Sequence, residues 1–282
     1  MVDIDKFNIV TSFYPIYIAT SNIVNGVEGV TLENMTDVTV GCLHDYQLTT
    51  KDMNKLEKAD AFIINGGGME SFLTKAINAY PKLNVINSSE GILEEHDHDE
   101  CNNSGHHHVH EANAHIWVSI DFYIKQVENI TEQLCKLDNI NSEKYLANSR
   151  KYIDNLSSLQ NEMSEKLGSL ENRNIVTFHE AFEYFAQDFD LNIVAVIERE
   201  PGTSPSAGEV AKIIDKIKET SAVAIFVEPQ YQDSSANVIA RETGIPVYTL
   251  DPLVSGVLDK GEYERLMRKN LLVLEEALNG EK

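Results

Sequence analysis

The sequence predicts an α/β protein of two lobes, each with a parallel sheet flanked by helices, joined by one long rigid helix. Short apolar runs alternate with helical patterns in the first and last parts of the chain. This alternation is typical of parallel strands with crossover helices. The middle of the chain carries long helical patterns instead. A chain of 282 residues is long enough for two lobes with separate cores.

The first lobe is expected at residues 1–140. Its predicted strands are short apolar runs at 7–13, 37–42, 61–64 and 83–86. A glycine-rich turn at 65–68 follows the third strand. Helical spacing of apolar residues predicts a helix at 120–137 that closes this lobe.

The connecting helix is expected at residues 141–170. Its apolar positions repeat with helical spacing and are Tyr152, Leu156, Leu159, Met163, Leu167 and Leu170. At 1.5 Å per residue the helix would be ~40 Å long, enough to run along a whole lobe. The second lobe, 171–282, has predicted strands at 174–178, 191–196, 223–227 and 245–250.

The formal net charge is −22, which argues against a nucleic-acid partner and suits a protein that attracts cations. No apolar run approaches the roughly 18 residues of a membrane span. The first five residues have no basic head or apolar stretch, so we expect either a cytoplasmic protein or one whose export signal has been removed. Three cysteines without a CxxC pair make a thiolate zinc site improbable, and at most one disulfide is possible.

Residues 94–111 form a histidine-rich segment that is predicted to be a surface loop with weak, adaptable metal binding. Its histidines are interspersed with carboxylates and Cys101, and they are His96, His98, His106, His107, His108 and His110. The alternatives are a purification tag, which would sit at a terminus, and a solvated loop without a ligand.

Three histidines lie outside this loop, and each is placed where a ligand is expected. His44 and His179 follow predicted strands, as does Asp251, and ligands bind at the carboxyl ends of strands in open α/β sheets. His115 comes just before the helix at 120–137. Two of the four residues belong to each lobe, so they could converge in the cleft between the lobes.

Three imidazoles and one carboxylate form a four-coordinate set suited to Zn²⁺ and favour it over Mn²⁺. A closed set without a water position favours storage or transport over hydrolysis. Zinc affinity should fall below about pH 6, because the histidines must be deprotonated to bind. Glu180 or Glu228 could orient the ligands through hydrogen bonds to them, although for each residue alone an ordinary helix-cap or surface acid is the favoured interpretation.

The chain resembles the zinc/manganese group of solute-binding proteins of bacterial ABC importers along nearly its full length. The motifs that carry the resemblance occur in order and are Phe13-Tyr14-Pro15, Cys42-Leu43-His44-Asp45-Tyr46, His115-Ile116-Trp117-Val118-Ser119, Phe178-His179-Glu180-Ala181-Phe182, Ser204-Pro205-Ser206 and Leu250-Asp251-Pro252-Leu253. The chain departs from the family pattern at Leu43, Gln47 and Ile120, which leaves all four candidate ligands in place.

The resemblance implies an exported receptor, periplasmic or lipid-anchored at the cell surface, that delivers zinc to a membrane permease. In this family the third ligand is histidine in zinc-type members and glutamate in many manganese-type members, so His179 points to zinc. We expect a monomer that is not an enzyme. The alternatives are a manganese or iron receptor of the same fold, an adhesin-like surface protein with structural metal, and a zinc hydrolase with Asp251 or Glu180 as base.

Overall fold

The computed structural model describes residues 6–38, 43, 46–93, 113–198, 204–230 and 234–279. These residues form two compact units that are interleaved along the chain. Unit 1 comprises Met1–Trp117, Phe122–Leu156 and Val254–Glu262, and unit 2 comprises Val118–Asp121, Ser157–Leu253 and Tyr263–Lys282. The long helix α5 (Ser142–Gly168) contributes to both units: its residues up to Leu156 belong to unit 1, and those from Ser157 belong to unit 2.

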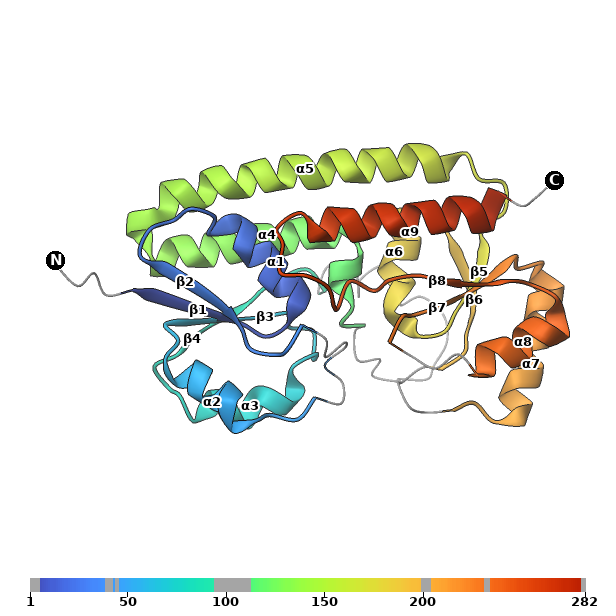
Figure 1. Ribbon diagram of the computed structural model, residues 1–282, viewed down its shortest axis with the longest axis horizontal. Helices are drawn as coiled ribbons and strands as arrows, with labels where there is room; N and C mark the ends of the chain where they lie inside the picture. The colour runs from blue at the N-terminus through green and yellow to red at the C-terminus, as the bar shows by residue number, and fades with distance from the viewer. Residues whose placement is uncertain are drawn as a thin grey trace. The chain divides into compact units, whose positions relative to one another are not determined.

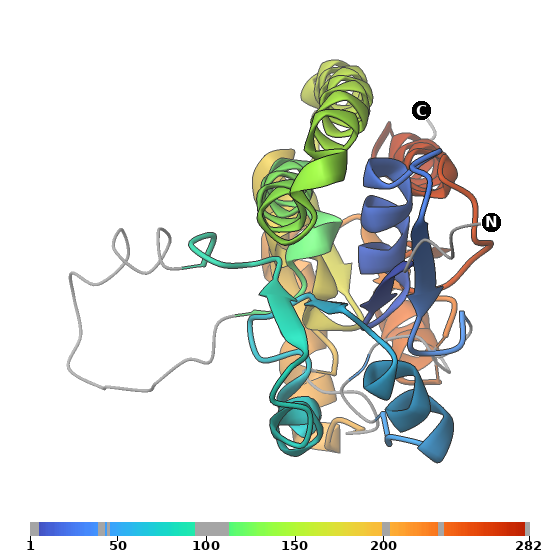
Figure 2. The same cartoon turned by 90° about the vertical axis from the view of Figure 1, so that its left-hand side faces the viewer.

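Unit 1 is built on a four-stranded parallel sheet in the order β2-β1-β3-β4. The strands are β1 (Phe7–Thr11), β2 (Val30–Asn34), β3 (Ala61–Ile64) and β4 (Asn84–Asn87). Its helices are α1 (Tyr14–Ile23), α2 (Thr50–Glu57), α3 (Thr74–Asn78), α4 (Ile120–Leu137), whose first two residues belong to unit 2, and the first part of α5. The helices α2 and α3 cover one face of the sheet (Figures 1 and 2). Leu56 of α2 and Ala76 of α3 belong to one buried cluster with Val10 and Phe62 of the sheet.

The turn after β3 requires glycine at residue 66. Gly66 has φ +84°, and a Cβ atom there would lie 1.9 Å from Asn87 Oδ1. A residue with a side chain would be strained in this conformation and would displace the side chain of Asn87. The same turn holds the buried polar groups behind His115 that are described below.

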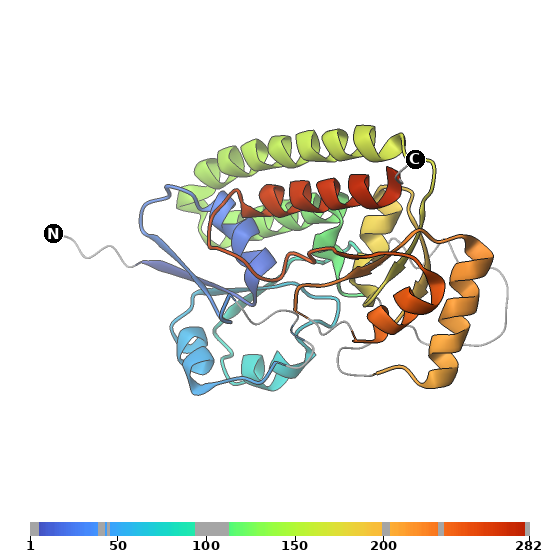
Figure 3. The ribbon, with the colours of Figure 1, turned by 45° about the vertical axis from the view of Figure 1, so that its right-hand side comes forward.

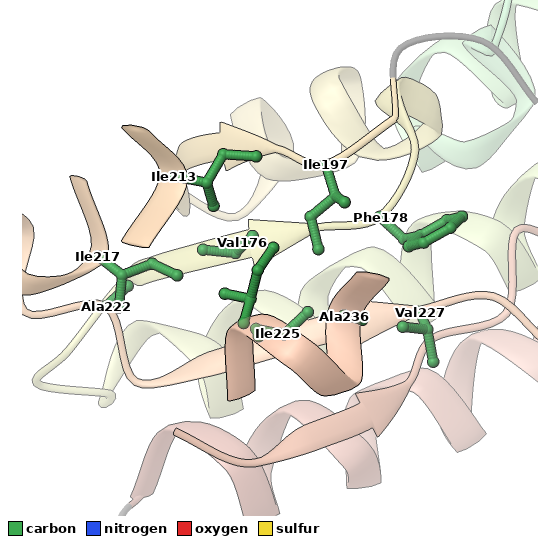
Figure 4. Close-up of a cluster of buried hydrophobic side chains, with 10 residues drawn as sticks. Val176, Phe178, Ile197, Ile213, Ile217, Ala222, Ile225, Val227 and Ala236 are labelled. Carbon is green, nitrogen blue, oxygen red and sulfur yellow. The ribbon is translucent and has the colours of Figure 1, made fainter. Parts of the chain in front are cut away.

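Unit 2 repeats the arrangement with a parallel sheet in the order β6-β5-β7-β8. The strands are β5 (Asn174–Thr177), β6 (Asn192–Val196), β7 (Ala224–Val227) and β8 (Val247–Thr249). Its helices are α6 (Glu183–Asp188), α7 (Ala207–Thr220), α8 (Ser234–Thr243) and α9 (Glu262–Asn279), the last of which begins in unit 1 (Figure 3). Buried side chains of α7 and α8 pack against Val176, Ile225 and Val227 of the sheet (Figure 4).

The predicted fold class is confirmed. The helix α4 begins at the expected residue, and α5 begins at Ser142, one residue after the expected start. One strand prediction is wrong: Asp37 and Val38 lie outside any strand, and the strand paired with β1 is Val30–Asn34. Residues 39–42 of that predicted strand are not among the described residues. The expected division of the chain at residues 140 and 170 stays a prediction. Within the described parts, no helix is long and apolar enough to cross a membrane.

The start of α4 is held by a carboxylate from α6 within unit 2. Asp188 accepts hydrogen bonds from Ser119 Oγ and from the Ile120 backbone N–H, both over 2.9 Å. These bonds satisfy donors that the first turn of a helix otherwise leaves without partners. Burial nevertheless raises the pKa of Asp188 to about 7, against the lowering effect of these hydrogen bonds.

We therefore expect the stability contributed at Asp188 to fall as pH rises from about 4 to about 7. The folded state binds this proton more tightly than the unfolded state, so the ionised form disfavours folding. The Asp188→Asn side chain cannot ionise, so this variant avoids the loss. The free energy of unfolding of Asp188→Asn minus that of the wild type should therefore rise by roughly 2–3 kcal/mol from pH 5 to pH 8. Denaturant titrations in a chelator would measure this difference.

Asp190→Asn is the matched control for this experiment, because Asp190 lies two residues away with a side chain that is 93% exposed. Its stability should run parallel to that of the wild type over the same pH range. An Asp188→Asn curve that also ran parallel would contradict the raised pKa.

Candidate metal centre

Three candidate residues of unit 2 lie at one edge of its sheet. His179 follows β5, Glu228 follows β7 and Asp251 follows β8, and these strands are neighbours in the sheet. The ladder continues beyond the strand ends, since Phe178 N–H donates to Phe226 O and Leu250 N–H donates to Val227 O. All three side chains are buried. The carboxyl ends of parallel strands thus bring these side chains to the same edge, as expected for a ligand site.

His179 and Glu228 form a buried imidazole–carboxylate pair. Nδ1 of His179 lies 3.4 Å from Oε1 of Glu228, and both side chains are at most 2% exposed. Burial raises the pKa of Glu228; the contact with His179 opposes this, and the charge of Asp251 adds to it. A carboxylate beside one ring nitrogen is the common partner of a histidine that binds metal through its other nitrogen.

Glu198 is a further carboxylate near His179, which the sequence analysis missed. Burial raises its pKa, and the neighbouring His179 lowers it. In the structure His179, Glu198 and Asp251 each come two residues after the last residue of their strand. A polar residue within two positions of a predicted strand end is the signal that could have found Glu198.

Asp251 is held by a side chain of α9. Its backbone N–H donates to Asn270 Oδ1 over 2.8 Å, and Asn270 Nδ2 donates to its carbonyl oxygen over 2.7 Å. Its carboxylate Oδ1 accepts the N–H of Leu253 over 2.9 Å. Leu253 has φ +61°, an unfavourable conformation for a non-glycine residue. The backbone of this turn is therefore fixed at both peptide groups of Asp251.

His115 belongs to unit 1 and precedes the short 3₁₀ helix η3 (Ile116–Val118). Its side chain is 1% exposed, and its ring lies against Trp117 with centroids 5.1 Å apart. Its ring Nδ1 and its backbone nitrogen both lie within hydrogen-bonding distance of Asn113 Oδ1, at 2.7 and 3.0 Å. The ring is thus buried with a defined orientation.

A buried polar network supports the peptide group before His115. Asn65 Nδ2 donates to the carbonyl oxygen of Ala114 over 2.9 Å, and Asn65 Oδ1 accepts from Gln126 Nε2 over 3.0 Å. The carboxylate of Glu70 accepts the backbone N–H groups of Asn65 and Gly66. Burial raises the pKa of Glu70, and these hydrogen bonds oppose the rise. The network connects the end of β3 to the segment that carries His115.

The structure places three of the four predicted ligands and brings two of them, His179 and Asp251, to one sheet edge. His44 lies outside the described residues, as do all six histidines of the 94–111 loop and two of the cysteines. Cys135 on α4 is a free thiol. Among the described residues, no three His, Cys, Asp or Glu side chains gather closely enough to hold a metal ion. The four-residue ligand set therefore stays a prediction.

The fold and the buried imidazole–carboxylate groups are those of a metal-binding solute-binding protein. A family model described as "ZnuA: Zinc-uptake complex component A periplasmic" matches residues 9–277. The chain belongs to this family, which confirms the resemblance and agrees with the expectation of a receptor that is not an enzyme.

Named relatives and a solved structure show the same likeness. The chain is 32% identical to the high-affinity zinc uptake system protein ZnuA of Bacillus subtilis, with coverage of 97% of this chain and 88% of that protein. It is 31% identical to the zinc-binding lipoprotein AdcA of Streptococcus pneumoniae over 98% of its own length, but it spans only 56% of AdcA. The structure of FpvC from Pseudomonas aeruginosa in complex with Mn²⁺ superimposes with a TM-score of 0.82 at 26% identity, with 97% and 98% of the two chains covered.

Proposed function

We propose that the chain is an extracytoplasmic receptor that binds Zn²⁺ and delivers it to the permease of an ABC transporter. The observation that carries the proposal is the carboxyl edge of the unit 2 sheet, where buried His179 is paired with Glu228 and the charge of Asp251 acts on Glu228. The zinc-binding and zinc-uptake relatives support the same cargo. The AdcA relative, a lipoprotein, supports a location outside the cytoplasm, and we propose a lipid-anchored or periplasmic monomer.

We further propose that His44, His115, His179 and Asp251 are the four ligands of one zinc ion. Imidazole nitrogen and carboxylate oxygen are ordinary zinc ligands, and four of them complete a tetrahedral shell without a water position. A closed shell fits a protein that carries the metal without using it for chemistry. The predicted lobe 1–140 would provide His44 and His115, and the predicted lobe 171–282 would provide His179 and Asp251. The predicted helix 141–170 would link the two lobes.

The histidine-rich loop is proposed as a secondary, weaker metal-binding segment. Isothermal titration calorimetry on the wild type and on a variant that lacks residues 94–111 tests both parts of the proposal. We expect one tight zinc site in both proteins and additional weak binding only in the wild type. Loss of all tight binding with the loop would refute the four-ligand site.

Manganese is the second candidate cargo, favoured by the Mn²⁺ complex of FpvC. The proposed set contains three imidazoles, which are softer ligands than carboxylates and favour zinc. Titration of zinc into manganese-saturated protein separates the two. Zinc should displace manganese at one equivalent, and a protein that keeps manganese in equimolar zinc would overturn the assignment of cargo.

A further inference from the structure

Asn113 and His115 form a compact hydrogen-bonded turn in the segment that leads into η3. The backbone nitrogen of His115 lies 3.0 Å from Asn113 Oδ1, and Nδ1 of the imidazole lies 2.7 Å from the same atom. One side-chain atom of Asn113 therefore contacts both a backbone group and a ring nitrogen of His115. The backbone N–H therefore determines which atom of the Asn113 amide faces His115 and which ring nitrogen of His115 carries a proton.

A peptide N–H can only donate a hydrogen bond, so the Asn113 atom that it meets must be the amide oxygen and not the NH₂ group. An amide oxygen can only accept, so Nδ1 of His115 must carry a proton to bond to it. Heavy-atom positions alone usually leave the orientation of an amide and the tautomer of an imidazole open. Here one backbone N–H settles both.

We propose that Asn113 is a positioning residue that holds neutral His115 as the Nδ1–H tautomer and so presents Nε2 as the nitrogen that binds metal. The second part rests on the proposed function, because it treats His115 as a ligand. Histidine in water prefers the opposite tautomer, with the proton on Nε2. A ligand held in the Nδ1–H form avoids the free-energy cost of moving that proton before the metal binds.

Two neighbouring contacts keep the turn in place. Asn65 Nδ2 donates to the Ala114 carbonyl oxygen, which fixes the peptide group between Ala114 and His115. The Trp117 ring lies against the imidazole, and Phe13 packs edge-on against Trp117 with centroids 5.0 Å apart. These contacts pack the ring of His115 from a second side, and the amide oxygen of Asn113 selects the protonated nitrogen.

The test uses the full chain with ¹⁵N-labelled histidine, in a chelator at a pH above 8, where the imidazoles are neutral. Long-range ¹H–¹⁵N spectra show which ring nitrogen carries the proton, and His115→Gln identifies the signal of His115. We expect Nδ1–H in the wild type and a shift toward Nε2–H in Asn113→Leu. Asn113→Asp keeps an acceptor oxygen and should keep the wild-type tautomer.

Zinc affinity is then measured by competition with a strong chelator. We expect Asn113→Leu to bind zinc at least about tenfold more weakly than the wild type, and Asn113→Asp to restore tight binding. The matched control lies in the other unit. Asn172 Oδ1 accepts the N–H of Asn174 over 2.9 Å in the same kind of turn without a histidine, at the start of β5 in unit 2, so Asn172→Leu should leave both measurements unchanged.

Nε2–H in the wild type, or an unchanged tautomer in Asn113→Leu, would overturn the inference even if zinc binds tightly. Equal weakening of zinc binding by Asn172→Leu would show that the effect is loss of a turn, and would also overturn it. A His115→Gln variant with wild-type zinc affinity would instead refute the proposed ligand set and the metal-binding part of the inference, while the nitrogen spectra alone would decide the tautomer.

Discussion

Replacement of His179 by alanine should weaken zinc binding at least about 100-fold. Structural zinc sites with four ligands bind with about 10–16 kcal/mol, so one ligand contributes about 3 kcal/mol, or about two powers of ten in affinity. The imidazole is buried with Glu228 at its Nδ1, so its removal takes away the nitrogen ligand that this sheet edge is built around. Competition against a strong chelator measures the affinity.

The experiment is best performed in the variant that lacks residues 94–111, so that loop histidines cannot take over the ion. That deletion alone should leave the tight site intact and serves as the control. A His179→Ala protein that still bound zinc as tightly as this parent would show that the tight site lies elsewhere.

Glu228→Gln should lower zinc affinity about 10–100-fold while the folded state remains intact. A carboxylate that faces the second nitrogen of a ligating histidine orients the ring and makes the other nitrogen a stronger ligand. Glutamine has nearly the same shape, but its amide carries no charge. Because burial raises the pKa of Glu228, the metal-free protein is not stabilised by this charge, and the melting temperature of Glu228→Gln in a chelator should equal or exceed that of the wild type at pH 8.

Glu198→Gln separates orientation of the ring from a general effect of negative charge. Glu198 influences His179 through its charge, whereas Glu228 lies directly beside the ring nitrogen. Both variants remove one carboxylate near the same histidine. We expect the Glu198 variant to lose clearly less affinity, and equal losses would contradict the orienting role of Glu228.

The parts of the fold that the sequence predicted are those with strong apolar patterns. The long stripe of α5 is buried at Tyr152, Leu156, Leu159, Met163 and Leu167, so its helical spacing was visible in the sequence. The edge strand β2 was missed because its residues are mostly half-exposed and include Glu33. An edge strand pairs on one side only and packs weakly, so it has no continuous apolar run to reveal it.

The candidate site was predictable where a polar residue follows a buried strand. His179 and Asp251 were found in this way because the strands before them read clearly as β5 and β8. Glu198 was missed because carboxylates in loops are common and carry no signal alone. The role of Asn113 depends on two hydrogen bonds to a single oxygen atom, and no residue pattern encodes which atom of an amide faces a ring.

The central claim is that one zinc ion is bound by residues far apart in the chain. A crystal structure of the zinc-loaded protein, with anomalous scattering recorded at the zinc edge, tests it most directly. We predict a single strong anomalous peak about 2.0–2.2 Å from nitrogen atoms of His44, His115 and His179 and from a carboxylate oxygen of Asp251. A strong peak bound only by histidines of residues 94–111, with none at His179 and Asp251, would contradict it.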